Sequence, residues 1–226
     1  MQRPRISINL AISADGKITS VDRRPSGWTS KKDHARLVEL RRSADALLIG
    51  MGTLIADRMT LTCREKMHQP LRCVISRGRS IDPDHPIFHR EGGPIHLVIM
   101  GEKIPLIDER ITEKVTLHHM TLESFLDHLK TNLGIENLHC EGGGELIRSL
   151  AEIDAIDEFH ATLAAHTIFT GASASTASGA INDYLPKSLS FELAHFEPDA
   201  ELGECFLTYK RKSRAQHQWP APCSSA

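Results

Sequence analysis

Three consecutive glycines separate an apolar run from a helical pattern. The run covers residues 135–140, the glycines are Gly142, Gly143 and Gly144, and the helical pattern covers residues 146–150. Residues without Cβ let successive backbone N–H groups approach an anion closely, and the positive end of the following helix adds to the attraction. A plain strand-to-helix turn has the same appearance, because the full GxGxxG spacing is absent. The segment therefore predicts either a phosphate cradle or a tight turn.

A second glycine-containing turn has a similar context. The apolar run 46–49 ends in Gly-Met-Gly-Thr at residues 50–53, and Asp57 lies one helical turn beyond Thr53. Two glycine turns at strand ends can face one ligand. This second turn therefore favours the phosphate-cradle interpretation of both.

Composition limits the class of protein that these turns belong to. The 226 residues are 40% hydrophobic and 25% charged, which suits one globular domain. A net charge of -2 gives no electrostatic footprint for nucleic acid, so a small substrate is expected. No apolar stretch reaches the length of a membrane span and no signal peptide is evident, so we expect a cytoplasmic protein without membrane contact. Its five cysteines are odd in number and scattered, which predicts free thiols.

Short apolar runs alternate with helical patterns along the chain. Besides the run before the three glycines, strands are predicted over 6–12, 46–49, 71–76, 95–100, 115–118, 156–163, 188–196 and 204–210. Helices are predicted from Thr29 or Ser30 through Arg42, over 121–133, and from the glycines to about residue 153. The last two strands, joined by a turn at 198–203, predict an antiparallel hairpin and therefore a mixed sheet. We expect one domain over 1–211 and a disordered tail over 212–226.

Three segments in this order and spacing resemble the riboflavin-biosynthesis pyrimidine reductase family. They are Asn-Leu-Ala-Ile-Ser-Ala-Asp-Gly-Lys at 9–17, Gly-Met-Gly-Thr-Leu-Ile-Ala-Asp at 50–57 and Glu-Gly-Gly-Gly at 141–144. The resemblance covers residues 6–210 and is to the C-terminal reductase half of a bifunctional deaminase-reductase, also found alone in archaea and fungi. The zinc signature of the deaminase half does not occur in the sequence. The resemblance implies a dihydrofolate reductase-like, three-layer α/β fold: a mixed, mostly parallel sheet with a C-terminal antiparallel hairpin and helices on both faces.

The resemblance also implies a reaction. It is the NADPH-dependent reduction of the ribosyl group of a 5-amino-6-ribosylaminopyrimidine 5′-phosphate to ribityl, by a homodimer. Whether the pyrimidine is deaminated or undeaminated stays open. No general acid is evident, so positioning of the reacting carbons should supply much of the acceleration.

The family pattern implies a set of cofactor-binding residues. Carried onto this chain, it consists of Ile12, Trp28, Thr53, Asp57, Ser76, Arg77, Gly142, Gly143, Gly144 and Glu145. Arg77 and Arg79 follow a predicted strand and either bind the 2′-phosphate of NADPH or form a solvated turn. Trp28 is either beside the cofactor or a core or lid aromatic. Asp57 is a catalytic candidate, or else it caps or forms an ion pair.

The implied substrate-binding residues form a second set. It consists of Asn9, Ser26, Arg41, Leu61, Arg64 and Glu141. Arg41 and Arg64 would bind the 5′-phosphate, although the sequence does not fix whether Arg41 or Arg42 turns inward. Glu141, also a catalytic candidate, can accept two hydrogen bonds side by side from an amino group and a ring N–H. No metal site is predicted, because the 13 histidines show no convincing ligand spacing.

Two alternatives remain at the level of sequence. One is a reductase of the same fold that acts on dihydrofolate, a pterin or another heterocycle. The other is a non-catalytic nucleotide-binding module, favoured if Arg58 and Met59, which replace a common Asp-Pro of the family, prevent nicotinamide from docking. The Ser- and Ala-rich residues 172–180 predict a mobile lid or a flexible surface loop.

Overall fold

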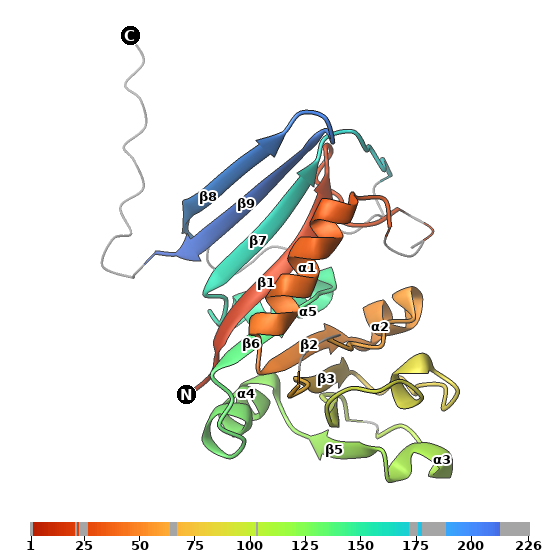
Figure 1. Cartoon of the computed structure of the whole chain (residues 1–226). Helices are drawn as coiled ribbons and strands as arrows, with labels where there is room; N and C mark the ends of the chain where they lie inside the picture. Colours follow the sequence, from red (N-terminus) through yellow and green to blue (C-terminus); the bar gives the residue numbers. More distant parts are fainter. Residues whose placement is uncertain are drawn as a thin grey trace.

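A nine-stranded sheet runs through the centre of the molecule (Figure 1). The computed structural model describes residues 2–20, 22, 27–63, 67–102, 104–171, 176–177 and 189–212. The strands are β1 (Arg5–Ser13), β2 (Ala46–Gly50), β3 (Leu71–Ser76), β4 (Ile95–Ile99), β5 (Val115–His119), β6 (Asn137–Cys140), β7 (Glu158–Ala164), β8 (Phe191–Asp199) and β9 (Glu204–Arg211). The helices are α1 (Lys31–Ser43), α2 (Met51–Asp57), α3 (Glu109–Thr112), α4 (Leu122–Thr131) and α5 (Gly144–Glu152), with a short 3-10 helix η1 (Pro86–Phe88).

The strand order is β5-β4-β3-β2-β6-β1-β7-β9-β8. Strands β1 to β7 pair in parallel, whereas β9 pairs antiparallel with both β7 and β8. The predicted mixed, mostly parallel sheet with an antiparallel C-terminal hairpin is therefore confirmed. The second strand of the hairpin, β9, lies between β7 and β8, so the first strand, β8, forms the edge of the sheet.

Helices cover both faces of the sheet, and alternation along the strands creates two cores. In β2, Ala46 and Leu48 belong to the core beneath α4 and α5, whereas Leu47 and Ile49 belong to the core that contains residues of α2, η1 and α3. Successive strand residues point to opposite faces, so a continuous apolar run is what a strand buried on both faces requires.

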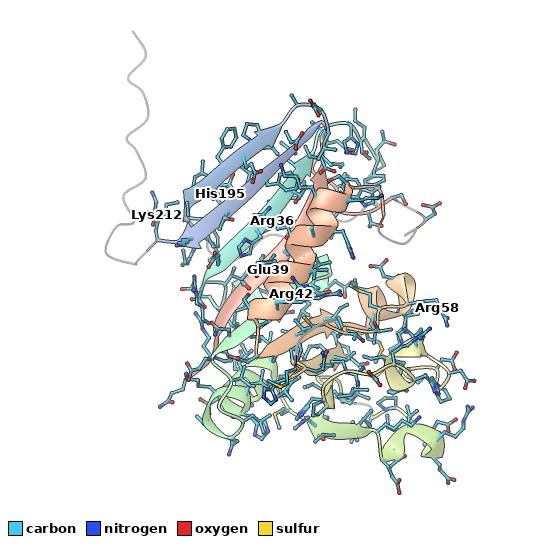
Figure 2. The ribbon with its side chains drawn as sticks, viewed as in Figure 1. Arg36, Glu39, Arg42, Arg58, His195 and Lys212 are labelled. Carbon is cyan, nitrogen blue, oxygen red and sulfur yellow. The ribbon has the colours of Figure 1, made fainter. Side chains whose placement is uncertain are left out.

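Helix α1 is attached to the sheet mainly by polar contacts. Ser30 is its N-cap, and the Ser30 hydroxyl accepts from the Asp33 N–H. The Arg36 guanidinium donates to the carbonyls of Ala161 (3.1 Å) and Leu207 (2.6 Å). Figure 2 labels Arg36, Glu39 and Arg42 along this helix. Hydrogen bonds to strand carbonyls therefore fix the helix over β7 and β9, where a purely apolar interface would allow sliding.

Predicted and observed elements agree closely in the parallel half of the sheet. The prediction for β3, residues 71–76, is identical to the observed strand, and the helix predicted from Thr29 or Ser30 is α1 with Ser30 as its cap. The short helices η1 and α3 were not predicted, since four residues or fewer carry no periodic signal. Residues 172–175, 178–188 and 213–226, which include most of the predicted loop and tail, lie outside the described residues.

Two further sequence expectations concern cysteines and membranes. Cys63, Cys73, Cys140 and Cys205 are free thiols, and Cys223 lies outside the described residues. Within the described part of the chain, no helix has both the length and the apolar character needed to cross a membrane.

Candidate functional site

A cavity of about 450 Å³ lies at the carboxyl ends of the central parallel strands. Its wall includes residues from β1, from the end of β3 and from the turns that follow β2 and β6. Open parallel sheets bind ligands at this edge, because every strand there leads into a loop or a helix N-terminus. The predicted site residues that line the cavity are Asn9, Trp28, Thr53, Asp57, Ser76, Arg77, Glu141, Gly143, Gly144 and Glu145.

The two glycine turns meet at one end of this cavity. Strands β2 and β6 are neighbours, and the Gly50 N–H donates to the Gly142 carbonyl at 2.8 Å. A Cβ on Gly143 would lie 2.7 Å from the Thr53 hydroxyl oxygen, which is closer than van der Waals contact allows. Gly142 adopts a φ of 95°, a conformation that favours glycine. Gly142 and Gly143 are therefore favoured by backbone conformation and close approach as well as by any ligand.

Helix α5 begins directly beside the cavity. Its N-cap is Gly143, and no side chain caps its first turn. Gly144 and Glu145, the first two residues of the helix, both line the cavity. The first N–H groups of a helix carry a partial positive charge, so this end of the cavity can bind an anion such as a nucleotide phosphate.

Glu141 forms a buried ion pair with Arg41. The Arg41 Nε donates to Oε1 of Glu141 at 2.5 Å, and Nη2 donates to Oε2 at 2.6 Å. The side chains are 13% and 3% exposed, respectively. Burial lowers the pKa of Arg41, but the hydrogen bonds and the negative charge of Glu141 outweigh this and leave that pKa above its usual value. The pair fixes the orientation of the carboxylate at the cavity wall.

This ion pair decides which of the two adjacent arginines turns inward. Arg41 bends toward the sheet, whereas Arg42 is exposed and has Glu39 at 3.4 Å. Arg41 does not line the cavity, and its guanidinium contacts the substrate-side carboxylate Glu141. The contact of Arg41 with the substrate phosphate stays a prediction, and in this structure the Arg41 guanidinium holds the Glu141 carboxylate.

Two arginines from the turn after β3 also line the cavity. The Ser76 hydroxyl donates to the Arg79 carbonyl (2.8 Å) and accepts from the Arg79 N–H (2.9 Å), which closes the turn after β3. From this turn the Arg77 guanidinium reaches Ser149 of α5, and Nη2 donates to its hydroxyl at 3.1 Å. Arg79 also lines the cavity, and its Nη1 comes within 3.9 Å of the position that a Cβ on Gly52 would occupy.

Not every predicted residue reaches the cavity. Leu61 is fully buried in the core that contains α2. Ile12 packs against the core beneath α4 and α5 and does not line the cavity. Gly142 does not line the cavity either, and its carbonyl accepts a hydrogen bond from the Gly50 N–H. Ser26 and Arg64 lie outside the described residues, so their substrate contacts stay predictions.

Some cavity residues were not among the predicted ones. Asp33, Met59, Met100 and Ser149 all line the wall. Asp33 is buried, and its carboxylate accepts from the hydroxyls of Thr162 (2.5 Å) and Thr29 (2.7 Å). Its place three residues after the N-cap Ser30 marks a helix start but gives no sign of a cavity, because that depends on where α1 lies on the sheet.

Two buried polar atoms beneath α1 have no hydrogen-bond partner among the described residues. They are Oδ1 of Asn9 and Nε2 of His139. Burial lowers the pKa of His139 to about 4, so this imidazole is neutral near pH 7. Unpaired buried acceptors are costly, and Asn9 stands in the cavity wall. In the described part of the chain, no cluster of three or more His, Cys, Asp or Glu residues could hold a metal ion.

The fold and the glycine-lined cavity define an α/β protein of the dihydrofolate reductase-like type. A sequence model described as RibD C-terminal domain matches residues 4–201, and the chain belongs to this family. It is 30% identical over 173 residues to a protein of Archaeoglobus fulgidus named 2,5-diamino-6-ribosylamino-4(3H)-pyrimidinone 5′-phosphate reductase, covering 69% of this chain and 78% of that relative.

Solved structures share the fold of this chain. RibD of Acinetobacter baumannii superposes with a TM-score of 0.77 at 21% identity, over 93% of this chain and 58% of that one. The riboflavin biosynthesis reductase Rib7 of Saccharomyces cerevisiae superposes with a TM-score of 0.69 at 18% identity, over 93% and 90% of the two chains. This chain thus spans little more than half the length of the RibD structure and nearly the whole of Rib7.

Proposed function

We propose that this chain reduces the ribosyl group of a 5-amino-6-ribosylaminopyrimidine 5′-phosphate to ribityl, with NADPH as the reductant. The observation that carries the proposal is the cavity in which two glycine turns, the start of α5 and Glu141 meet. The names of the Archaeoglobus and Saccharomyces relatives support the reaction. We place the activity in one domain over residues 1–211.

The cavity fits a nicotinamide dinucleotide. The close contact between Gly143 and Thr53 leaves no room for a Cβ, so backbone N–H groups of this turn and of Gly144 and Glu145 can approach a pyrophosphate. Thr53 and Asp57, on α2, would hold the nicotinamide side. When bound, the reduced nicotinamide supplies the hydride.

A preference for NADPH over NADH is supported by the arginines after β3. Arg77 and Arg79 both line the cavity, and Arg77 is held toward it by Ser149. A 2′-phosphate carries extra negative charge, which guanidinium groups bind through paired hydrogen bonds.

Glu141 is proposed to recognise the aminopyrimidine edge. Its two oxygens offer about four lone-pair positions, so they can accept from Arg41 and from a ligand together. Asn9 lines the same wall and would supply a further hydrogen-bonding group. Arg41 is engaged by Glu141, and Arg64 is the other arginine proposed to bind the substrate phosphate.

The chain's contribution to the reaction is mainly positioning. Holding the cofactor and the ribosyl carbon in contact inside a cavity replaces a bimolecular encounter and excludes water. Asp57 lines the cavity and is proposed to assist proton transfer to the opening ring, directly or through water. Arg58, the cap residue after α2, is exposed at the outer edge of the molecule (Figure 2), whereas Met59 lines the cavity.

The test uses purified chain, NADPH and the ribosylaminopyrimidine 5′-phosphate in its deaminated and its amino form. Loss of absorbance at the reduced-nicotinamide band with one form identifies the substrate. Glu141→Gln should lower kcat/KM by about 100-fold, since a buried hydrogen-bonding carboxylate is lost at the substrate edge. Glu113→Gln serves as the matched control, because Glu113 is exposed, lies just before the edge strand β5 and does not line the cavity.

Other outcomes separate the alternatives. Oxidation of NADPH with a dihydropterin, but not with either ribosylaminopyrimidine, would indicate that the chain is a pterin reductase. Tight NADPH binding without turnover of any of these substrates would indicate a non-catalytic nucleotide-binding module. Oxidation of NADH as fast as NADPH would contradict the role of Arg77 and Arg79.

We also propose that the chain is a homodimer and acts in the cytoplasm. One of the two edge strands of the described sheet, β8, exposes Leu193 (53%) and Phe196 (59%). An edge strand with exposed apolar side chains favours pairing with a second copy. Light scattering after size-exclusion chromatography tests the mass, and Phe196→Lys should shift the protein toward the monomer; a wild-type monomer at micromolar concentration would reject the dimer.

A further inference from the structure

We propose that Asp15 is a positioning residue that holds the Trp28 wall of the cavity in place. It acts through the backbone of residues 167–171, the segment that follows β7. Asp15 does not line the cavity, whereas Trp28 does. The consequence for cofactor affinity rests on the proposed function, but the consequence for the position of Trp28 does not.

The Asp15 carboxylate joins two segments that are distant in sequence. Its Oδ1 accepts from the Phe169 N–H at 3.2 Å, and its Oδ2 accepts from the Thr170 N–H at 2.9 Å. The two segments come together because β1 and β7 are parallel neighbours and end at the same edge. The Ala14 N–H also donates to the Thr167 carbonyl at 2.9 Å.

The backbone around Thr170 is shaped to bind an anion. Thr170 has a φ of 55° and Gly171 a φ of 81°. Successive N–H groups near a left-handed residue point into one concavity, which a carboxylate fills. Thr170 is not glycine, so its left-handed conformation needs support from its surroundings. Asp15 supplies this support, and its removal leaves the turn without its anion.

Asp15 is itself held from the strand side. The hydroxyl of Ser13, a fully buried residue, donates to Oδ1 of Asp15 at 2.6 Å. This hydrogen bond, followed by those from the Phe169 and Thr170 N–H groups, keeps the pKa of Asp15 below its usual value although burial opposes it. The Ser13 hydroxyl therefore helps to orient the Asp15 carboxylate toward the segment after β7.

Phe169 connects the Asp15 contact to Trp28 through a contact between their rings. The two rings make an edge-to-face contact, with centroids 4.8 Å apart and an interplanar angle of 83°. Such aromatic pairs are directional. The Asp15 contact fixes the backbone of Phe169, so it also fixes the surface against which Trp28 rests.

The other side of Trp28 is anchored independently. Glu204 is buried at the start of β9, and its Oε1 accepts from the Ser30 N–H at 2.8 Å. Its Oε2 accepts from the Ser30 hydroxyl at 2.5 Å. Trp28 thus lies between one carboxylate that fixes the start of α1 and another that fixes Phe169. Without Asp15, the N–H groups of Phe169 and Thr170 lose their acceptor, while the Glu204 anchor remains.

The test measures Trp28 directly in a Trp219→Phe background, which leaves one tryptophan in the chain. Emission wavelength and acrylamide quenching report the exposure of Trp28, and energy transfer to NADPH reports the dissociation constant. Asp15→Ala should shift the emission to the red, raise the quenching constant about twofold and raise the Kd for NADPH about tenfold with a smaller change in kcat, which is a loss of about 1.4 kcal/mol in binding. Asp15→Asn keeps one acceptor and should lie between.

Matched variants separate positioning from general instability. Asp84→Ala removes an exposed aspartate that pairs with Arg110 away from the cavity and should leave all three readouts at wild-type values. Phe169→Leu should reproduce the Asp15→Ala effect on Kd. The double variant should add little to either single change, because both act on one contact.

Each outcome decides the proposal. Unchanged Trp28 emission and quenching in Asp15→Ala overturns it, and so does additivity in the double variant. If the wild-type chain does not bind NADPH, the proposed function fails, while emission and quenching still decide the role of Asp15. If Asp15→Ala does not fold, Asp15→Asn and Phe169→Leu give the same comparison.

Discussion

Arg41 and Glu141 are 100 residues apart in sequence and form a two-point ion pair at the cavity wall. One comes from α1 and the other directly follows β6. Removing one partner of a buried pair leaves an uncompensated charge, which costs far more than the pair itself contributes. The pair therefore couples the docking of α1 to the orientation of the proposed substrate-binding carboxylate.

Arg41→Met tests this coupling. The side chain of Glu141 is 3% exposed, so we expect the free energy of unfolding to fall by about 3 kcal/mol. Urea unfolding of the variant gives the value. The matched control is the exposed neighbour, Arg42→Met, which should change stability by less than about 0.5 kcal/mol. Equal losses in both variants would show that the ion pair is not important for stability.

Gly143→Ala tests the close approach of the two glycine turns. A Cβ at this position would lie 2.7 Å from the Thr53 hydroxyl oxygen, so we expect a loss of about 2 kcal/mol and weaker NADPH binding. Adding Thr53→Ala should restore stability, because the clashing atom is removed, but not the binding. Gly50→Ala is the control: its Cβ would meet atoms no closer than 3.7 Å. A fully stable Gly143→Ala protein would contradict this geometry.

The histidines buried between β4, β5 and α4 predict acid sensitivity. Burial, followed by the charges of His118 and His128, lowers the pKa of His96 to about 4. The unfolded chain then binds more protons than the folded chain between about pH 6.5 and pH 4. Stability should therefore fall as the pH falls through this window, by on the order of 2 kcal/mol from His96.

His96→Asn checks this assignment. The variant has no imidazole to protonate at this position, so its unfolding free energy should change less between pH 7 and pH 4.5 than that of the wild type. Chemical unfolding at several pH values gives both curves. If the two curves run parallel, the acid sensitivity comes from other groups, such as His139, whose pKa burial also lowers to about 4.

Arg72 predicts a loss of stability that does not involve the cavity. Its guanidinium is buried, and it donates to the carbonyls of Gly93 (2.7 Å), Ile87 (2.9 Å) and Thr60 (3.3 Å). Arg72→Lys keeps the charge but lacks the planar set of donors, so we expect a loss of about 2 kcal/mol. Thermal unfolding measures the change.

Arg90→Lys is the matched control for Arg72, because Arg90 is exposed. It should leave the melting temperature nearly unchanged. A similar small effect in Arg72→Lys would mean that charge alone, rather than the three-way carbonyl contact, is sufficient at the buried position.

The extent to which the fold followed from sequence differs between its two halves. The apolar run 71–76 predicts β3 without error, because a strand buried on both faces leaves a continuous apolar signal. Sequence also indicated the hairpin of β8 and β9. It did not show that β9, rather than β8, pairs with β7. Apolar and polar residues alternate similarly in both strands, so the sequence allows either of them to lie next to β7.

Some residues of the candidate site could likewise be predicted from the sequence, whereas the positions of others depend on the tertiary structure. Glycines after strands are a local signal, and together with the family resemblance they marked Thr53, Asp57, Glu141, Gly143 and Gly144, which all line one cavity. The choice between Arg41 and Arg42 depends on the rotation of α1 over the sheet. The place of Leu61 depends on tertiary structure too, because the path of the chain after α2 directs its side chain into the core.

The sequence by itself determined the strands, the three longer helices α1, α4 and α5, the parallel-rich α/β class and the two glycine turns, because each depends on local periodicity or on residues without Cβ. Tertiary structure alone decided that Arg41 engages Glu141 and that Asp15 reaches the segment after β7. Both contacts join residues more than 90 positions apart. They depend on strand order and helix docking, which arise from packing the whole core and leave no signal in any short stretch of sequence.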